Sequence, residues 1–386
     1  MHRPGDTVAA ILERLISFDT TSHKTNIALI LYVEDYLRGL GVASFLVPTA
    51  DGQKASLFAT IGPPDVPGIA LSGHTDVVPV DGQAWDTDPF TLIKRDGRYF
   101  GRGTSDMKGF LACVLAAVPR FKAANLKKPV HIAFSYDEEI GCIGVRPMIA
   151  EMGTKLPLPR VVIVGEPTDM RVVDAHKGPV RWQIDVAGLA AHSSMAHLGV
   201  NAITYAGFII GELTRIESEL AAGVPDTRFE PPFPTLQVTT IEGGTASNIV
   251  PVSCRFGFEI RSMPGLDIGA IETRLQRFIA TQCLPAMRAR APGAGIALTR
   301  KNYVPPFSAG DGSEAVELAL ALAGQNETFA VSYATEAGLF QDAGAASVVC
   351  GPGNIAQAHT ANEWIAAAEL DKCMTFMDRL ADWCAA

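Results

Sequence analysis

Apolar residues near the start of the chain recur at the three- and four-residue spacing that places them on one face of a helix. This spacing predicts an amphipathic helix over residues 6–19, with Asp6 or Thr7 as its N-cap. The apolar stripe of this helix consists of Val8, Ile11, Leu12, Leu15 and Ile16. A second helix is predicted over residues 26–40, because the helical pattern there stops at glycines 39 and 41.

Long apolar runs then alternate with helical segments up to about residue 177. The runs predict strands over 43–48, 56–61, 69–73, 130–136 and 160–165, and the segments between them predict helices over 106–123 and near 142–152. Asp96-Gly97 lies between two short strand-like segments and predicts a hairpin turn. Strands without polar alternation are typical of a sheet that helices cover on both faces. This part of the chain therefore predicts an α/β fold.

The pattern of elements changes near Lys177-Gly178. From there the chain predicts the split β-α-β-β-α-β arrangement. Its elements cover 180–187, 200–220, 235–241, 252–260, 267–283 and 295–300. We therefore predict an inserted α+β domain over residues 178–298. Residues 1–177 and 299–386 then form one discontinuous domain, which is completed by helices over 313–323 and 363–382 and by strands over 329–333 and 346–350.

Composition and charge narrow the class of protein. The chain has 386 residues, of which 48% are hydrophobic and 19% charged, as expected for a globular protein of two domains. Its net charge of −9 argues against nucleic acid and an anionic membrane surface as partners. We see neither an apolar run of membrane-spanning length nor a signal peptide. The seven cysteines show no paired spacing, which favours reduced thiols and a cytoplasmic location.

Histidines and carboxylates occur where several of the apolar runs end. These residues are His74, Asp76, Asp106, Glu138, Glu139, Glu166 and His359. The carboxyl ends of strands in an α/β sheet meet at one edge, where such proteins place their sites. Two imidazoles and several carboxylates suit a pair of divalent metal ions, which activate one water for hydrolysis. The residues alone therefore favour a hydrolase.

Each of these residues also has an ordinary structural interpretation. His74 could be a satisfied histidine at a strand end, and Asp106 a carboxylate that favours a helix N-terminus. Two neighbouring glutamates after a strand usually form a solvated turn, and a loop histidine such as His359 is by itself a weak sign of a ligand. Asp76 shares the side of His74 along an extended chain and can accept a hydrogen bond from its imidazole. The conjunction of all these residues favours the metal site.

Eight segments make the chain similar to the M20 family of di-zinc peptidases and deacylases. In family order they read SGHTDVVP, WDTDPF, GRGTSDMKG, DEEIG, VGEPT, GLAAHSS, SNIVP and AHTANEW, and they span nearly the whole length. The resemblance implies a zinc-exopeptidase-like catalytic domain with a central mixed sheet covered by helices. It also implies that the inserted domain is ferredoxin-like, acts as a lid and joins two copies into a homodimer.

The resemblance further implies a role for each polar residue at the strand ends. The ligands of two Zn²⁺ or Co²⁺ ions would be His74, Asp106, Glu139, Glu166 and His359. Asp106 would bridge the two ions, and the peptide bond after the bridging aspartate is commonly cis in the family. Glu138 would be the general base, and Asp76 would orient His74. A glutamate at position 166 is the choice of the deacylase branch.

Three residues of the inserted domain are implicated by the same resemblance. His192 is the candidate donor to the tetrahedral oxyanion, and many relatives supply this histidine from the partner subunit. Without the family context, His192 would be a surface histidine in a loop. Asn248 and Arg261 would hold the substrate carboxylate, which a planar guanidinium can bind through two hydrogen bonds. A surface ion pair is the alternative for Arg261.

The segment YATEAGLFQD at residues 333–342 resembles the acetylornithine deacetylase branch of the family. The implied reaction is hydrolysis of the amide bond of a small N-acyl amino acid, with N-acetyl-L-ornithine as the expected substrate. Glu336 could pair with the ornithine ammonium or be a local structural carboxylate. The alternatives are a deacylase for another N-acyl amino acid, a metallo-exopeptidase for small peptides, and a binding protein on a decayed hydrolase fold. The intact ligand and base positions argue against the last.

Overall fold

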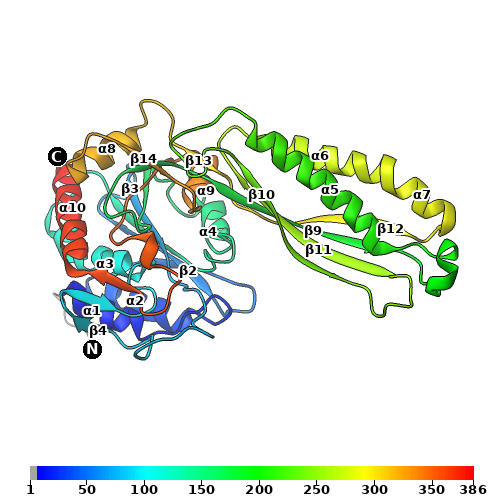
Figure 1. Ribbon diagram of the computed structural model, residues 1–386. Coiled ribbons are helices and arrows are strands. Elements are labelled where there is room, and N and C mark those ends of the chain that lie inside the picture. The colour runs from blue at the N-terminus through cyan, green and yellow to red at the C-terminus, as the bar shows by residue number, and fades with distance from the viewer. Residues whose placement is uncertain (1–6) are drawn as a thin grey trace. The chain divides into compact units, whose positions relative to one another are not determined.

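The computed structural model of the protein describes residues 7–386, and the chain divides into two compact units (Figure 1). The first contains the chain up to Ala175 together with Ser308–Ala330 and Thr335–Ala386. The second contains His176–Phe307 and Val331–Ala334. Among the helices of the described residues, none has the length and apolar character needed to cross a membrane.

A nine-stranded mixed sheet forms the centre of the first unit. Its order is β1-β2-β6-β3-β7-β15-β8-β13, with β14 paired to β8. The neighbours β6, β3, β7 and β15 run parallel, whereas β1, β2 and β6 alternate in direction. The strands are β1 (Ser44–Pro48), β2 (Ala55–Ile61), β3 (Ile69–His74), β6 (Val130–Ser135), β7 (Val161–Val164), β8 (Val173–His176), β13 (Phe307–Ser308), β14 (Phe329–Val331) and β15 (Ala346–Val349). The predicted α/β fold with a central mixed sheet is confirmed.

Helices cover both faces of this sheet. They are α1 (Val8–Ile16), α2 (Ile27–Gly39), α3 (Lys108–Ala123), α4 (Val145–Glu151), α8 (Glu314–Ala323), α9 (Ala337–Asp342) and α10 (Ala367–Ala385). One hydrophobic cluster joins α1, α2, α3, α8 and α10 to the face of the sheet that carries Leu71. The next side chain, Ser72, points to the opposite face and donates a hydrogen bond to Glu336, directly before α9. Helices α9 and α4 therefore cover that face, where they contact each other.

A smaller sheet of the first unit has the order β16-β5-β4. Its strands are β4 (Ile93–Arg95), β5 (Arg98–Phe100) and β16 (Trp364–Ala366). Asp96 and Gly97 form the predicted two-residue turn between β4 and β5, with φ angles of 50° and 71°. The helix expected from residue 363 begins only at Ala367, because residues 364–366 pair with β5 instead.

The second unit contains a four-stranded antiparallel sheet with helices on one face (Figure 1). Its elements are β9 (Gly178–Ala187), η1 (Ser193–Leu198), α5 (Ala202–Ala221), β10 (Thr235–Gly243), β11 (Ser253–Ser262), α6 (Ile268–Phe278), η2 (Ile279–Cys283), α7 (Leu284–Arg290) and β12 (Gly295–Tyr303). The strand order β10-β11-β9-β12 is that of a ferredoxin-like sheet. Side chains alternate along β9, so that Trp182 and Ile184 pack against the helices whereas Arg181 is exposed.

Two details of the structure differ from the boundaries expected from sequence. The expected domain boundary at residues 298 and 299 falls inside β12, because this strand continues to pair with β9 as far as Tyr303. The helix expected over 106–123 begins at Lys108, so Asp106 lies before the helix and not in its first turn. Short elements such as α9 carried too few residues for their periodicity to be recognised.

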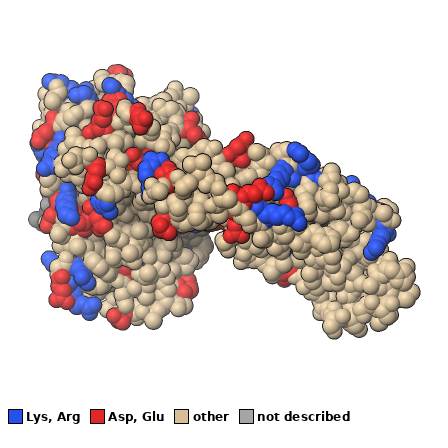
Figure 2. All heavy atoms as spheres, turned by 45° about the horizontal axis from the view of Figure 1, so that its top comes forward, with Lys and Arg blue, Asp and Glu red and all other residues tan. Residues whose placement is uncertain are grey.

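Caps, thiols and surface charge complete the description. The Oγ1 of Thr7 accepts a hydrogen bond from the backbone N–H of Ala10, as expected of an N-cap, whereas Asp6 lies outside the described residues. All seven cysteines are buried and unpaired. In the view of Figure 2, positive and negative side chains are interspersed over the first unit, without a large patch of either sign.

Candidate metal centre

The polar residues predicted to form a metal site converge at one edge of the large sheet. His74 ends β3, the pair Glu138–Glu139 follows β6, and Glu166 follows β7. Since these three strands are adjacent and parallel, their carboxyl ends meet at the same edge. Asp106 comes from the loop before α3, and the bond from Asp106 to Met107 is cis, as expected. His359 comes from the loop after η3 (Ile355–Gln357).

Glycines next to two of these residues let the start of α3 approach the strand ends. Gly73 precedes His74, and a Cβ at Gly73 would lie 2.6 Å from the terminal methyl of Met107. Gly165 precedes Glu166, and a Cβ there would lie 2.2 Å from the ring of Phe110. Because neither position has room for a side chain, glycine is the residue that allows Asp106 to reach His74 and Glu166.

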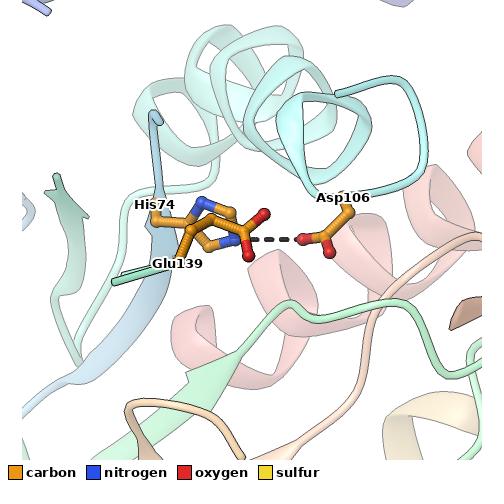
Figure 3. Close-up of side chains that lie close together, drawn as sticks. All are labelled: His74, Asp106 and Glu139. Atoms are coloured by element: carbon orange, nitrogen blue, oxygen red, sulfur yellow. Dashed lines mark hydrogen bonds and ion pairs between the residues drawn. The ribbon is translucent and has the colours of Figure 1, made fainter. Parts of the chain in front are cut away.

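Asp106 lies between two groups of ligand atoms. Its Oδ1 is 3.0 Å from Nε2 of His74 (Figure 3). The same nitrogen of His74 is 3.6 Å from Oε1 of Glu166. Its Oδ2 is 3.3 Å from Nε2 of His359, which is 3.1 Å from Oε2 of Glu139. We name these groups the His74 triad (His74, Asp106, Glu166) and the His359 triad (His359, Asp106, Glu139). The two triads share Asp106, as a pair of metal sites with a bridging carboxylate requires.

The donor atoms fit divalent metal ions. Ligand atoms of His74, Asp106 and Glu139 lie within 4.8 Å of one another, and so do those of His74, Glu138 and Glu166. One imidazole nitrogen and two carboxylates in each triad match the nitrogen and oxygen ligands of catalytic zinc sites. His74 and Asp106 are buried, whereas the side chain of His359 is 51% exposed, which leaves one side of the site open to solvent.

The crowding of buried carboxylates raises their pKa values. Burial and the neighbouring Asp106 raise the pKa of Glu139 to about 7, and the same two causes raise the pKa of Glu166 well above its usual value. Burial also raises the pKa of Glu138 well above the usual range. Asp106 behaves differently, because contacts with His359 and His74 overcome the effect of burial and lower its pKa.

Both histidines hold protons strongly when only protein groups surround them. Burial by itself would lower the pKa of His74, but Asp106 and Asp76 raise it well above the usual value. Hydrogen bonds to Asp106 and Glu139 raise the pKa of His359 to about 10. Protons on the two imidazole rings thus offset part of the carboxylate charge, and they occupy the Nε2 atoms that would bind metal ions. Metal binding must therefore displace protons.

Asp76 contacts more than its predicted partner. The Nδ1–H of His74 has its nearer acceptor in the backbone carbonyl of Asp76, at 2.9 Å, whereas the carboxylate expected in that role is 3.5 Å away. That carboxylate accepts hydrogen bonds from Oγ of Ser22 and from the backbone N–H groups of Glu138 and Glu139. Asp76 therefore also fixes the turn that carries the two glutamates.

Cys142 contacts the predicted base, although sequence reasoning treated it as an ordinary buried thiol. Its Sγ lies 3.2 Å from Oε1 of Glu138 and donates a hydrogen bond to that oxygen. In the sequence, the only sign of this contact is the separation of four residues between Glu138 and Cys142, with Gly141 in between. It could not be interpreted before the left-handed backbone at Cys142, with φ of 53°, was known.

Glu336 lies on the opposite face of the sheet from the large hydrophobic cluster and is 1% exposed. Its carboxylate accepts hydrogen bonds from the hydroxyl groups of Ser72 on β3 and Ser135 on β6. Burial raises its pKa to about 7. Both carboxylate oxygens of Glu336 are bonded inside the protein. This arrangement favours a structural role for Glu336 over contact with a substrate ammonium.

The remaining predicted residues lie in the second unit, at two separate places. Nδ1 of His192 is 2.7 Å from Oγ of Ser194, and the backbone N–H of Ser193 donates to the carbonyl of Asn248. His192 and Asn248 are therefore neighbours, and Asn248 lies in the segment that leads into β11. Arg261 lies near the other end of β11 and pairs with Glu259 at 2.7 Å. The eight steps along the strand from Ser253 to Arg261 span roughly 26 Å.

Comparison with known proteins identifies the family of this chain. A model of peptidase family M20/M25/M40 matches residues 70–383. The acetylornithine deacetylase of Pasteurella multocida (strain Pm70) is 33% identical over 94% of this chain and 93% of its own. That of Proteus mirabilis (strain HI4320) is 32% identical over 94% of this chain and 92% of its own. The chain belongs to peptidase family M20/M25/M40. It is a metal-dependent hydrolase of that family.

Solved structures share the fold at low sequence identity. An M20 metallo-carboxypeptidase of Sulfolobus solfataricus superimposes with a TM-score of 0.76 and 20% identity, covering 98% of this chain and 99% of its own. Human carnosine dipeptidase 1 gives a TM-score of 0.72 with 16% identity, covering 98% and 96%. A dinuclear metal-binding M20 peptidase of Bacillus subtilis gives 0.68 with 17% identity, covering 97% of each chain.

We predict that metal binding to the metal-free protein at pH 7 releases at least one proton per chain. His359, with its pKa raised to about 10, is protonated at this pH and must lose that proton to become a ligand. The apparent metal affinity should therefore rise as pH increases from 6 to 8. Titration calorimetry in buffers of different ionisation enthalpy measures the proton count. A count of zero at pH 7 would show that His359 does not become a ligand.

Proposed function

We propose that the protein hydrolyses the amide bond of an N-acyl amino acid, with N-acetyl-L-ornithine as substrate and L-ornithine and acetate as products. The observation that carries the proposal is the pair of triads sharing Asp106, with Glu138 directly beside them. Two curated relatives that align over nearly the whole chain are acetylornithine deacetylases, and this supports the choice of substrate. Release of ornithine would place the reaction in arginine biosynthesis.

The two triads are proposed to hold two Zn²⁺ or Co²⁺ ions. When bound, such ions polarise a carbonyl and lower the pKa of coordinated water. Their positive charge would also lower the pKa values that burial raises at Glu139 and Glu166. The ligands proposed are His74 and Glu166 on one side, His359 and Glu139 on the other, with Asp106 shared.

Glu138 is proposed to move the proton of the reaction. It takes a proton from the attacking water as the oxygen bonds to the acyl carbon, and it gives that proton to the amine nitrogen as the C–N bond breaks. Burial favours the protonated carboxyl, which allows Glu138 to keep the proton between the two steps. The hydrogen bond from Cys142 reaches Oε1 and leaves Oε2 of Glu138 for this transfer.

The second unit is proposed to supply the remaining contacts to the substrate as a lid and dimerisation domain. His192 would donate a hydrogen bond to the oxyanion, and Asn248 and Arg261 would hold the carboxylate. Because Arg261 lies at the opposite end of β11 from His192 and Asn248, one copy of this unit does not bring all three to one substrate. A homodimer resolves this separation if the two ends come from different copies.

Apolar exposure on the second unit supports such a dimer. The exposed side chains around η1 and the start of β11 are those of Leu189, Met195, Leu198, Ile203, Ile249 and Val252. They lie at the end of the unit that carries His192, and the right-hand end of this unit is largely uncharged in Figure 2. Exposed apolar side chains gathered at one end of a unit are typical of an interaction site in a soluble protein.

The substrate proposal is tested with a panel of N-acetyl derivatives of ornithine, citrulline, methionine and lysine, beside simple dipeptides. We expect the largest kcat/KM for N-acetylornithine and negligible hydrolysis of dipeptides. A preference for dipeptides would overturn the deacetylase assignment and favour an exopeptidase. Glu336→Gln on the same panel separates a contact with the ornithine ammonium, which requires a loss confined to cationic substrates, from the structural role, which predicts a loss for every substrate.

We predict that Glu138→Gln lowers kcat by about 10²–10⁴-fold, the usual contribution of general acid–base catalysis, while metal content stays at the wild-type level. Glu139→Gln, its neighbour in sequence, is the matched variant and should instead weaken metal binding, because it removes a ligand of the His359 triad. Steady-state kinetics and metal analysis of the same preparations separate the two effects. Near-normal turnover by metal-loaded Glu138→Gln would place the base elsewhere.

We predict that His192→Ala and Glu138→Gln complement each other when mixed under conditions of subunit exchange. Each mutant homodimer lacks one group at every site, whereas a mixed dimer holds one intact composite site if His192 serves the neighbouring chain. Activity should therefore recover toward a fraction of wild type after mixing. Demonstrated exchange without recovery would confine His192 to its own chain or remove it from the reaction.

A further inference from the structure

Glu363 carries a buried carboxylate that the proposed reaction does not use. It is 1% exposed and follows His359 by four residues in the segment AHTANEW. Its Oε1 accepts hydrogen bonds from the backbone N–H groups of Ser105 and Asp106, at 2.8 and 3.0 Å. Its Oε2 accepts from the backbone N–H of Gly103 at 2.9 Å and from Nη1 of Arg102 at 2.7 Å. Each oxygen therefore has two donors.

The hydrogen bonds continue from Arg102 to the backbone of His359. Nη2 of Arg102 donates to Oε1 of Gln83 at 2.6 Å, and Nε2 of Gln83 donates to the carbonyl of His359 at 2.9 Å. The side chain of Asn362 ties the same two loops together, because its Oδ1 accepts from the backbone N–H of Asp86 at 2.9 Å. A continuous network thus joins the backbone of Asp106 to that of His359.

Stability alone does not explain this network. Burying a carboxylate with a guanidinium costs desolvation energy, and apolar residues of the same volume often stabilise a protein equally well. The geometry instead favours a role in positioning the loop before α3, because all four donors to Glu363 come from residues 102–106. The planar fork of Arg102 reaches Glu363 and Gln83 together, which a lysine cannot do in the same geometry.

The two residues that the network joins are the ones that need such support. His74 is the last residue of a buried strand, and Glu166 follows another by two residues, so the sheet itself fixes their backbones. Asp106 and His359 lie in loops, and the side chain of His359 is 51% exposed with a backbone φ of 61°. The sheet does not fix these two backbones, so contacts between the loops and their neighbours must hold Oδ2 of Asp106 and Nε2 of His359 at their separation of 3.3 Å.

We propose that Glu363, with Arg102 and Gln83, is a positioning residue that sets the distance between Asp106 and His359 and so determines metal affinity at the His359 triad. The inference rests on the proposed function, because it takes Asp106 and His359 to be metal ligands. It adds that residues which touch neither metal nor substrate act mainly on the His359 triad, because the sheet fixes the backbones of His74 and Glu166.

The experiment measures Co²⁺ binding to the metal-free full-length protein by titration calorimetry, together with the visible spectrum of the bound Co²⁺. Glu363→Gln keeps the size of the side chain but turns an amide N–H₂ toward two donors. We expect affinity for one of two Co²⁺ ions to fall by about 10–100-fold, the usual effect of losing a partner behind a ligand. The visible absorption of that ion should change as well, because its ligand geometry changes.

Glu212→Gln is the matched control. Glu212 is 7% exposed and accepts hydrogen bonds from Arg215 and Arg274, each at 2.8 Å, within the second unit. Its loss should lower stability and leave Co²⁺ affinity and spectrum at wild-type values. A loss of Co²⁺ affinity in Glu212→Gln equal to that in Glu363→Gln would overturn the proposal, because any buried carboxylate would then have the same effect.

Gln83→Leu keeps the proposal testable if Glu363→Gln does not fold. Gln83 is only partly buried, and its substitution releases the carbonyl of His359 while leaving the bonds of Glu363 to Asp106 in place. We expect a smaller loss of affinity for the same single ion. Wild-type affinity and spectrum in folded Glu363→Gln, or in Gln83→Leu when it alone folds, would contradict the proposal.

The ligand variants His359→Ala and Asp106→Ala, measured in parallel, distinguish failure of the proposed metal centre from failure of the positioning role. If both variants retain two ions at wild-type affinity, the assignment of the metal centre is wrong, and so is the positioning role that depends on it. If both lose metal while Glu363→Gln and Gln83→Leu bind normally, the metal centre stands and only the positioning role is wrong.

Discussion

The candidate metal centre depends on one shared carboxylate. The two oxygens of Asp106 point to two different histidines, His74 and His359, which come from opposite ends of the chain. Glu139 and Glu166 lie within the same small volume, and burial raises the pKa of each. Such a concentration of buried negative charge is unfavourable unless cations balance it. Protons on the histidines supply part of that balance, and metal ions in the two triads would supply more.

Several features of the fold bring Asp106 to this position. Parallel strands carry His74, Glu138 and Glu166 to one edge of the sheet. Glycines at 73 and 165 remove the side chains that would hold α3 away from that edge. The carboxylates of Asp76 and Glu363 then fix the backbones of the flanking turns by accepting their N–H groups. Sheet, helix and loops therefore each contribute a separate constraint to one group of side chains.

Sequence reasoning reached the fold and the members of the site through different signals. Uninterrupted apolar runs predicted the strands, and the place of His74 and Glu166 after such runs predicted where they lie, because strand ends of a parallel sheet share an edge. The hairpin at Asp96-Gly97 was predictable because its turn residues favour positive φ. The long loop that carries His359 offered no such rule, and only the resemblance of its motif to a family indicated a ligand.

Other features could not be obtained from the sequence because they depend on contacts between distant segments. Glu363 and Arg102 are 261 residues apart and read as an ordinary charged pair until the loops are placed side by side. Cys142 and Glu138 are close in sequence, but their contact requires a left-handed residue. The expected domain boundary at residue 298 falls inside β12 because the apolar run of this segment ends at Leu298, whereas its backbone pairing with β9 continues to Tyr303.

The separation of two bound metal ions tests the central claim most directly. X-ray absorption at the cobalt edge, combined with anomalous diffraction from crystals of the Co²⁺-loaded protein, gives both the distance and the ligands of each ion. If Asp106 is shared, two ions lie about 3.5–4 Å apart, with one oxygen of Asp106 bound to each. A single ion at full loading, or two ions of which only one is bound by Asp106, would contradict the account.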